Sequence, residues 1–310
     1  MKRLGFYLSA IAFIVGGLTL NTACSDSFVD TSDGNPMNVA SRNREASAEA
    51  KKYWYDGTAE ITSYKLSQAR YGEMREGKAV MVFVTEPFSR ESFTKADGNN
   101  ESNVPVLKLN ATKKFTTGIY PYSLMTSSFF PFEGDNESIK IAFTMQEWCG
   151  TMFSEMRNQK GELSFSLDSY FEGESFENQQ VKSAFLEDDI WSLIRLNPDG
   201  LPAGEITMVP SMAYLRMSHK PLKAYKTMAE SRENKNGTMV LTLSYPELNR
   251  TLSIEYESDF PHAILGWEET YIDGGRELTS KAERIKQIKS AYWNKNSNSD
   301  TNLREELGLD

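Results

Sequence analysis

The segment Lys-Ala-Val-Met-Val-Phe-Val-Thr at positions 78–85 decides the fold class, because a run of apolar and β-branched residues is typical of a buried strand. Similar short runs recur at regular intervals from position 58 onward. Turn residues such as Tyr71-Gly72 and Asp97-Gly98 separate them. This spacing predicts an antiparallel sandwich or barrel. Apolar patterns of helical length are missing between the runs, which argues against a doubly wound α/β fold.

Strands are predicted near residues 58–70, 78–85, 104–116, 119–130, 138–148, 151–157, 162–172, 175–183, 204–216, 223–231, 238–245, 249–257, 263–272 and 277–292. Short helices are predicted at 42–53, 186–196 and 301–307. The last strand also fits a helix, because apolar residues recur at helical spacing from Ala282 to Tyr292, so both stay open. The predicted fold is mainly β: a curved antiparallel sheet or half-open barrel, similar in architecture to lipocalin-like or lipoprotein-carrier folds, with a few short helices.

The N-terminus has the order of a bacterial lipoprotein signal. Lys2 and Arg3 supply the positive flank, and residues 4–20 carry no charge. The string Leu-Asn-Thr-Ala-Cys at 20–24 resembles a lipobox whose leucine stands one position earlier than in the strict pattern. We therefore predict cleavage before Cys24, acylation of its thiol and a lasting membrane anchor.

The predicted organisation is a lipoprotein signal peptide (1–23), a flexible tether (24–40) and a single β-rich domain (41–310). The tether is polar, contains Gly and Pro, and lacks periodicity. Removing residues 1–23 leaves 287 of 310 residues, and the loss of two positive charges changes the formal net charge from −9 to −11. An acidic surface argues against nucleic acid and anionic lipid heads as partners.

The sequence offers no catalytic or cofactor motif. It contains neither a Gly-x-Ser-x-Gly nucleophile elbow nor a glycine-rich phosphate loop. His219 and His262 each stand alone, whereas zinc sites use ligand pairs at short spacing. The acidic run 187–189 fits pairing with a helix dipole better than a calcium site. No cofactor, no metal site and no enzymatic activity are predicted.

Apart from Cys24, the chain has one cysteine, Cys149. A lone thiol without a neighbouring His or Lys is expected to be a buried small hydrophobe rather than a reactive nucleophile. The mature chain then holds no disulfide, so its fold rests on the core alone.

Residues 118–132 are unusually aromatic and contain two prolines, and a second aromatic group lies near the C-terminus. Such residues on a curved strand can line an apolar cavity or form an exposed docking lip. Ordinary core packing accounts for them as well, so both interpretations stay open. The candidate ligand or partner surface consists of Tyr120, Tyr122, Leu124, Met125, Phe129, Phe130, Trp267 and Tyr271.

Several strings, among them Tyr-Trp-Tyr-Asp-Gly at 53–57, Phe-Thr-Thr-Gly-Ile-Tyr-Pro-Tyr-Ser at 115–123 and Trp-Glu-Glu-Thr-Tyr at 267–271, carry a family resemblance. Over nearly the whole mature chain, the sequence resembles a family of uncharacterised Bacteroidota lipoproteins often labelled "septum formation inhibitor Maf". That label implies a cytoplasmic nucleotide pyrophosphatase with a Ser-x-Ser-Pro-Arg-Arg signature. No Pro-Arg-Arg occurs in this sequence. The label is therefore treated as a misnomer, and the resemblance carries over no catalytic residue.

The resemblance also implies a location. In such bacteria, acidic residues after the lipidated cysteine direct lipoproteins to the cell surface, and Asp26 and Asp30 are a partial version of that signal. The resemblance thus implies the outer membrane of the cell envelope and leaves the leaflet open.

We therefore expect an envelope lipoprotein that binds or carries an apolar ligand. The alternative is an envelope scaffold that docks a partner protein. A surface hydrolase is a third possibility, and it would need Glu, Asp or His residues from distant strands to meet in a cleft. The expected partners are the membrane, through the lipid anchor, and an apolar small molecule or an envelope protein. Nucleic acid is not expected.

Overall fold

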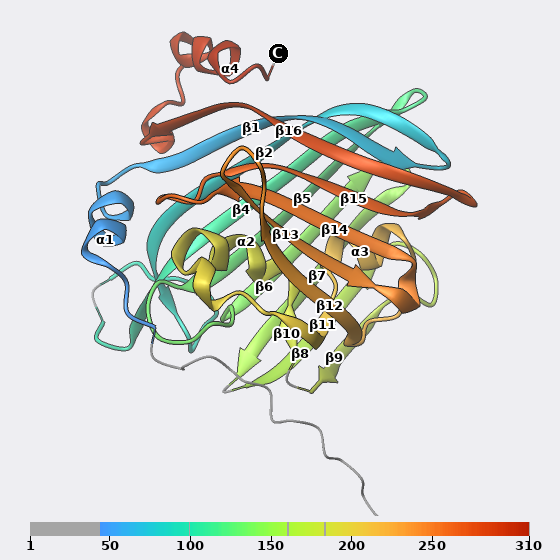
Figure 1. Cartoon of the computed structure of the whole chain (residues 1–310), viewed down its shortest axis with the longest axis horizontal. Helices are drawn as coiled ribbons and strands as arrows, with labels where there is room; N and C mark the ends of the chain where they lie inside the picture. The colour runs from blue at the N-terminus through green and yellow to red at the C-terminus, as the bar shows by residue number, and fades with distance from the viewer. Residues whose placement is uncertain (1–43, 99, 160, 183, 310) are drawn as a thin grey trace, which may run out of the picture. The chain divides into compact units, whose positions relative to one another are not determined.

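The computed structural model describes residues 44–98, 100–159, 161–182 and 184–309 (Figure 1). The predicted signal peptide, the tether and Cys24 lie outside these residues. Nearly all described strands belong to one 16-stranded sheet.

The strands are β1 (Ala59–Arg70), β2 (Glu73–Ser89), β3 (Thr94–Lys95), β4 (Asn103–Thr117), β5 (Tyr120–Pro131), β6 (Lys140–Glu147), β7 (Gly150–Gln159), β8 (Glu162–Ser169), β9 (Phe176–Val181), β10 (Phe185–Leu186), β11 (Gly204–Val209), β12 (Tyr225–Glu233), β13 (Thr238–Tyr245), β14 (Arg250–Glu257), β15 (Ile264–Asp273) and β16 (Arg276–Ser290). The α-helices are α1 (Ala48–Trp54), α2 (Glu187–Leu196), α3 (Met212–Met217) and α4 (Asn302–Glu306). Short 3₁₀ helices are η1 (Pro198–Gly200), η2 (Pro246–Leu248), η3 (Tyr292–Asn294) and η4 (Asn298–Asp300).

The sheet is an open antiparallel meander. Its order runs from β10 through β11–β16 to β1, β2 and β4–β9, with β3 beside β2. Among the described strands, only β10 and β11 pair in parallel. Strands β10 and β9 form the two ends of this order, so the sheet is not closed. The predicted fold class, a mainly β curved sheet or half-open barrel with a few short helices, is confirmed.

Alternation along the strands builds the core. On β14, residues 250, 252, 254 and 256 are buried and their neighbours are half-buried, as expected for a sheet with one covered face. The main core joins inward residues of β1, β2 and β4–β8 with those of β10–β16 and with α1, α2 and α3. The two halves of the curved sheet thus share one interior.

The segment 78–85 is apolar on both faces for a reason that the structure supplies. Ala79, Met81 and Phe83 point into the main core. The alternate valines on the outer face pack with Leu307, which follows α4. A C-terminal helix therefore covers the outside of the strand, and a fully apolar run results.

Several predicted boundaries change. Strand β2 continues through Pro87, which pairs with Pro105 on β4. The open assignment at 277–292 is resolved as a strand, β16. The predicted strand 204–216 is wrong in its second half, because Ser211 caps a short helix, α3, by accepting a hydrogen bond from the backbone N–H of Tyr214.

Candidate functional site inside the curved sheet

The eight predicted surface residues do not form one surface. On β5, Tyr122, Leu124 and Phe130 alternate on the inner face and are buried. Met125 and Phe129 point to the outer face. Phe129 packs there against Phe88 with a ring distance of 4.5 Å. These two residues therefore lie on the other side of the sheet from the interior.

The remaining predicted residues divide in a similar way. Trp267 and Tyr271 are buried on the inner face of β15. Tyr120 is half-buried at the β4–β5 turn, with its ring 6.2 Å from that of Trp148. Of the eight, only Leu124 and Trp267 line the interior cavity described below.

Helix α2 lies inside the curved sheet, since eight of its 10 residues are buried. Trp191 on the helix meets Trp267 on β15 edge to face, with ring centroids 5.4 Å apart. The helix also contacts β5, on the other half of the sheet. Helix α3 contacts β5 as well, and Tyr214 on α3 meets Tyr271 on β15 at 5.7 Å. The two helices fill much of the space that an open carrier fold would leave for its ligand.

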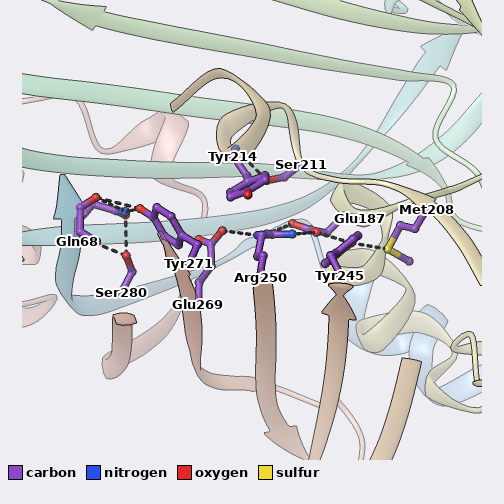
Figure 2. Close-up of polar contacts among 11 residues, drawn as sticks. Gln68, Glu187, Met208, Ser211, Tyr214, Tyr245, Arg250, Glu269, Tyr271 and Ser280 are labelled. Carbon is purple, nitrogen blue, oxygen red and sulfur yellow. Dashed lines mark hydrogen bonds and ion pairs between the residues drawn. The ribbon is translucent and has the colours of Figure 1, made fainter. Parts of the chain in front are cut away.

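Buried charges tie α2 to the sheet. Arg250 on β14 donates from Nη1 and Nη2 to the two carboxylate oxygens of Glu187, at 2.5 and 2.6 Å, and from Nε to Glu269 at 2.8 Å (Figure 2). The Tyr245 hydroxyl donates to Glu187 at 2.6 Å. Burial alone would raise the pKa of Glu187, but the Arg250 charge and these hydrogen bonds outweigh it and hold the pKa below its usual value.

A second buried pair holds the other end of the helix. Arg195 in the last turn of α2 makes a bidentate pair with Glu60 on β1, in which Nη2 lies 2.6 Å from Oε2. The side chains are 1% and 0% exposed. Arg195 Nε also donates to the carbonyl oxygen of Pro261 at 2.9 Å. Both ends of α2 are therefore fixed by charge-assisted hydrogen bonds.

Two further carboxyls at the start of α2, those of Asp188 and Asp189, form no ion pair within 4.0 Å among the described residues. Asp188 accepts a hydrogen bond from the backbone N–H of Met212 at 3.1 Å, and Asp189 accepts one from Ser138 at 3.0 Å. Desolvation is the largest cause that raises the pKa of Asp188 to about 7, followed by the nearby charge of Glu187. Desolvation also raises the pKa of Asp189 to about 8. Near neutral pH, both are therefore partly or mostly protonated.

A cavity of about 60 Å³ lies between α2, β4, β5, β14 and β15. Its lining includes the apolar residues Leu109, Leu124 and Trp267. The polar residues Lys113, Ser128 and Asp188 lie among them, since Ser128 pairs with Leu109 and Lys113 with Leu124 across β4 and β5. The cavity therefore combines an apolar surface with a few hydrogen-bonding groups, as small-molecule sites do.

Lys113 is the most unusual residue of the cavity. It pairs across the sheet with Ala79 and Leu124, both core residues, so its side chain shares their inward face. Its ammonium group lies 5.7 Å from the ring centroid of Trp267. Among the described residues it forms no ion pair within 4.0 Å. An inward lysine without a carboxylate partner is a donor available to a ligand.

Ser128 adds a second available donor. The side chain is 1% exposed, and its hydroxyl has no hydrogen-bond partner among the described residues. Buried hydroxyls are normally paired, so an unpaired one on a cavity wall indicates a place for a polar atom. Together with Lys113, it gives the cavity two available donors and suits a ligand that accepts hydrogen bonds.

The structure adds to one sequence-based interpretation and shows another to be wrong. The acidic residues 187–189 stand in the first turn of α2, but their main contacts are with three different elements of the interior. Within the described ranges, no group of three His, Cys, Asp or Glu residues is arranged to hold a metal ion. Cys149, predicted to be buried, is exposed in the β6–β7 turn. A hydrogen bond with Glu147 raises the pKa of its thiol, which disfavours the nucleophilic thiolate.

Neither histidine contributes to the interior site. His219 follows α3 and faces Arg216 and Glu174. His262 precedes β15, where its ring nitrogen Nδ1 lies 3.3 Å from the carbonyl oxygen of Glu257.

Sequence reasoning missed Lys113, Arg250 and Glu60, the charged residues that enter the interior from strands. A signal was present. Arg250 is in phase with Leu252 and Ile254 on a strand of alternating residues, so its side chain had to point inward. A charged residue at an inward position of a predicted strand would have indicated a side chain of the interior site.

No protein-family model matches the chain, and no curated protein matches it. Among solved structures, it is similar to a β-barrel-like protein of the domain of unknown function DUF1849 from Brucella abortus, with a TM-score of 0.38 and 9% identity over 75% of this chain and 98% of that chain. It is also similar to a porin-like protein from Bacteroides uniformis ATCC 8492, with a TM-score of 0.19 and 12% identity over 73% and 95% of the two chains. Similarity at this level does not inform the function. None of the helices that the structure describes has the length and hydropathy to cross a bilayer.

Proposed function

We propose that this protein is a lipid-anchored protein of the cell envelope, held at the outer membrane, that binds a small ligand in the cavity beside α2. The observation that carries the proposal is the combination, in one cavity, of apolar lining residues with two available donors, Lys113 and Ser128. The mainly β curved sheet is compatible with a binding or carrier protein.

The volume of the cavity limits the size of the predicted apolar ligand. One water needs about 10–15 Å³ in this measure, so about 60 Å³ holds roughly four to six waters or a molecule of similar size. Drug-sized ligands occupy pockets of roughly 300–1,000 Å³. The ligand that fits is therefore small, with a short apolar part and a carbonyl or carboxylate group.

Propionate is a suitable probe, because it combines a short apolar chain with a carboxylate. We expect propionate at tenfold its Kd to increase the free energy of unfolding by about 1.4 kcal/mol relative to chloride at equal ionic strength. The K113M variant should lose this increase, and S128A should reduce it. An equal increase in wild type and K113M would show a general salt effect and contradict the cavity as the site.

The anchor is tested separately. Cells fed an alkyne fatty acid should incorporate the label into the wild-type protein and not into a C24S variant. An unlabelled wild-type protein that retains residues 1–23 would contradict the proposed anchoring and location.

The second candidate, an envelope scaffold that docks a partner protein, is favoured by a different observation. Exposed apolar side chains gather in the hairpin turns at one end of the sheet. The two candidates use different residues and are compatible with each other.

A further inference from the structure

Four hairpin turns place aromatic or aliphatic side chains at the same end of the sheet. The strand registers show this: Gly77 pairs with Phe115, Ser123 with Gln146, and Met152 with Ser169, so the β1–β2, β4–β5, β6–β7 and β8–β9 turns share one end. We call their apolar residues the aromatic rim: the exposed Tyr71, Ile119, Trp148, Tyr170 and Phe171, and the half-buried Tyr120.

The members of the aromatic rim are in contact along much of its length. The hydroxyl of Tyr71 lies 2.7 Å from that of Tyr122, whose ring centroid is 5.9 Å from that of Tyr120. Tyr120 in turn lies 6.2 Å from Trp148. The rim is therefore one surface at this part of the sheet and not a set of isolated side chains.

The rim continues onto the β8–β9 turn through Gly150. A Cβ atom built on Gly150 would lie 2.5 Å from the ring of Tyr170, so this ring packs directly on the backbone of Gly150. Gly150 itself stands two residues after Trp148. The neighbouring ring of Phe171 is 5.5 Å from that of Tyr170. Trp148 is 68% exposed and Tyr170 67%, which is unusual for large aromatic side chains.

Two arginine side chains of this chain form cation–π contacts with rings of the aromatic rim. Arg70 lies over the ring of Tyr71 at 4.2 Å, and Arg216 lies over Phe171 at 5.2 Å. Both arginines are largely buried. The rings of Tyr71 and Phe171 therefore each contact a cation on the protein side and present the rest of their surface to solvent.

Two exposed carboxylates flank the ring of Tyr170. Asp168 and Glu172 are exposed on either side of Tyr170, at the end of β8 and in the turn. The mature chain carries a predicted formal charge of −11. An acidic aromatic surface attracts cationic side chains and repels anionic lipid heads.

We propose that the aromatic rim docks a partner protein through a basic segment, whose arginine or lysine side chains stack on the exposed rings and pair with Asp168 and Glu172. The inference rests on the scaffold function and names the chemistry of its partner. Covering four or five such side chains removes on the order of 600–1,000 Å² from solvent at most, so the complex is expected to be weak to moderate, with a micromolar Kd.

The test uses the mature chain with the C24S substitution and octa-arginine as the probe, measured by titration calorimetry. We expect a micromolar Kd at low salt, weakened at least tenfold by W148S and severalfold by the D168N/E172Q double variant. The matched control is W293S, because Trp293 is 45% exposed and follows β16 at the opposite end of the sheet. This control should bind as the wild type does.

Cys149 provides a second readout, since it is exposed beside Trp148 and is the sole thiol once Cys24 is replaced. Bound peptide should slow its alkylation. Equal affinity of W148S and W293S, or no binding, would overturn the proposal. Binding of the wild type to phosphatidylethanolamine vesicles, lost in W148S, would also overturn it by identifying a bilayer as the occupant. K113M should leave peptide binding unchanged, so the rim and the cavity can fail independently.

Discussion

Replacing Asp189 by Asn should flatten the dependence of stability on pH. Asp189 is 4% exposed, accepts one hydrogen bond from the backbone N–H of Ser138, and leaves its other carboxylate oxygen without a partner among the described residues. Its pKa rises from 3.8 to about 8, mainly through desolvation. The folded state therefore prefers the protonated carboxyl, whereas the unfolded chain ionises at much lower pH.

The sign and size of the effect follow from linkage. A pKa that is raised in the folded state gives stability that is complete below the unfolded pKa and is lost as pH rises through the folded pKa. Each pH unit in this interval costs about 1.4 kcal/mol, so Asp189 should remove roughly 2–3 kcal/mol between pH 6 and pH 8. An asparagine keeps an amide oxygen for the Ser138 N–H and cannot ionise.

Urea unfolding at pH 6, 7 and 8 measures this directly, provided that the m-value stays constant. The D189N variant should lose less stability over this range than the wild type. It should retain some slope, because Asp188 has a pKa raised to about 7 and titrates in the same interval. A D189N variant with the same slope as the wild type would refute the argument that burial keeps this carboxyl protonated.

Two further substitutions probe the interior and the sheet. R195M should lower the free energy of unfolding by about 3–5 kcal/mol in urea titrations, because it leaves Glu60 buried without a counter-charge. The E60Q/R195M double variant should recover part of the loss. A loss below about 1 kcal/mol in R195M alone would contradict the importance of the buried pair. G266A should cost about 1–3 kcal/mol in the same assay, since its Cβ would lie 2.4 Å from the backbone oxygen of Ala282 on the paired strand. G98A, with open space around the position, is the matched control and should be near neutral.

The fold class could be predicted from sequence because strand alternation is a local signal. Period-two patterns, as along 250–257, gave the strands, and turn residues separated them. Helix α2 was also predictable from its acidic start and its Asn-Pro-Asp-Gly end. Helix α3 was missed although Ser211 is a recognisable N-cap, because the following six residues are largely apolar and fit a strand equally well.

The candidate site was harder to predict, because it depends on how the sheet curls. Sequence alone cannot tell which strands face each other across an interior. Lys113 and Asp188 are far apart in the chain and meet only because α2 lies between β5 and β15. The residues chosen for the candidate surface were a poorer guide to the site, since Met125 and Phe129 share a strand with Leu124 but point to its other face. Parity along the strand would have separated them.

The buried charges also bear on the size of ligand that the proposed site could admit. To admit a lipid-sized molecule, α2 would have to leave the interior. That movement would separate Glu187 from Arg250 and Arg195 from Glu60, residues that are almost completely buried in the folded state. Breaking a buried pair costs about 3–5 kcal/mol when the remaining charge stays desolvated.

Buried pairs of this kind add little net stability compared with apolar packing, but they fix the position of the elements that carry them. Here they hold the first and last turns of α2 against β14 and β1. The helix is therefore a fixed wall of the cavity and not a displaceable plug. A cavity of constant shape selects ligands by size, which favours a small ligand over a carried lipid.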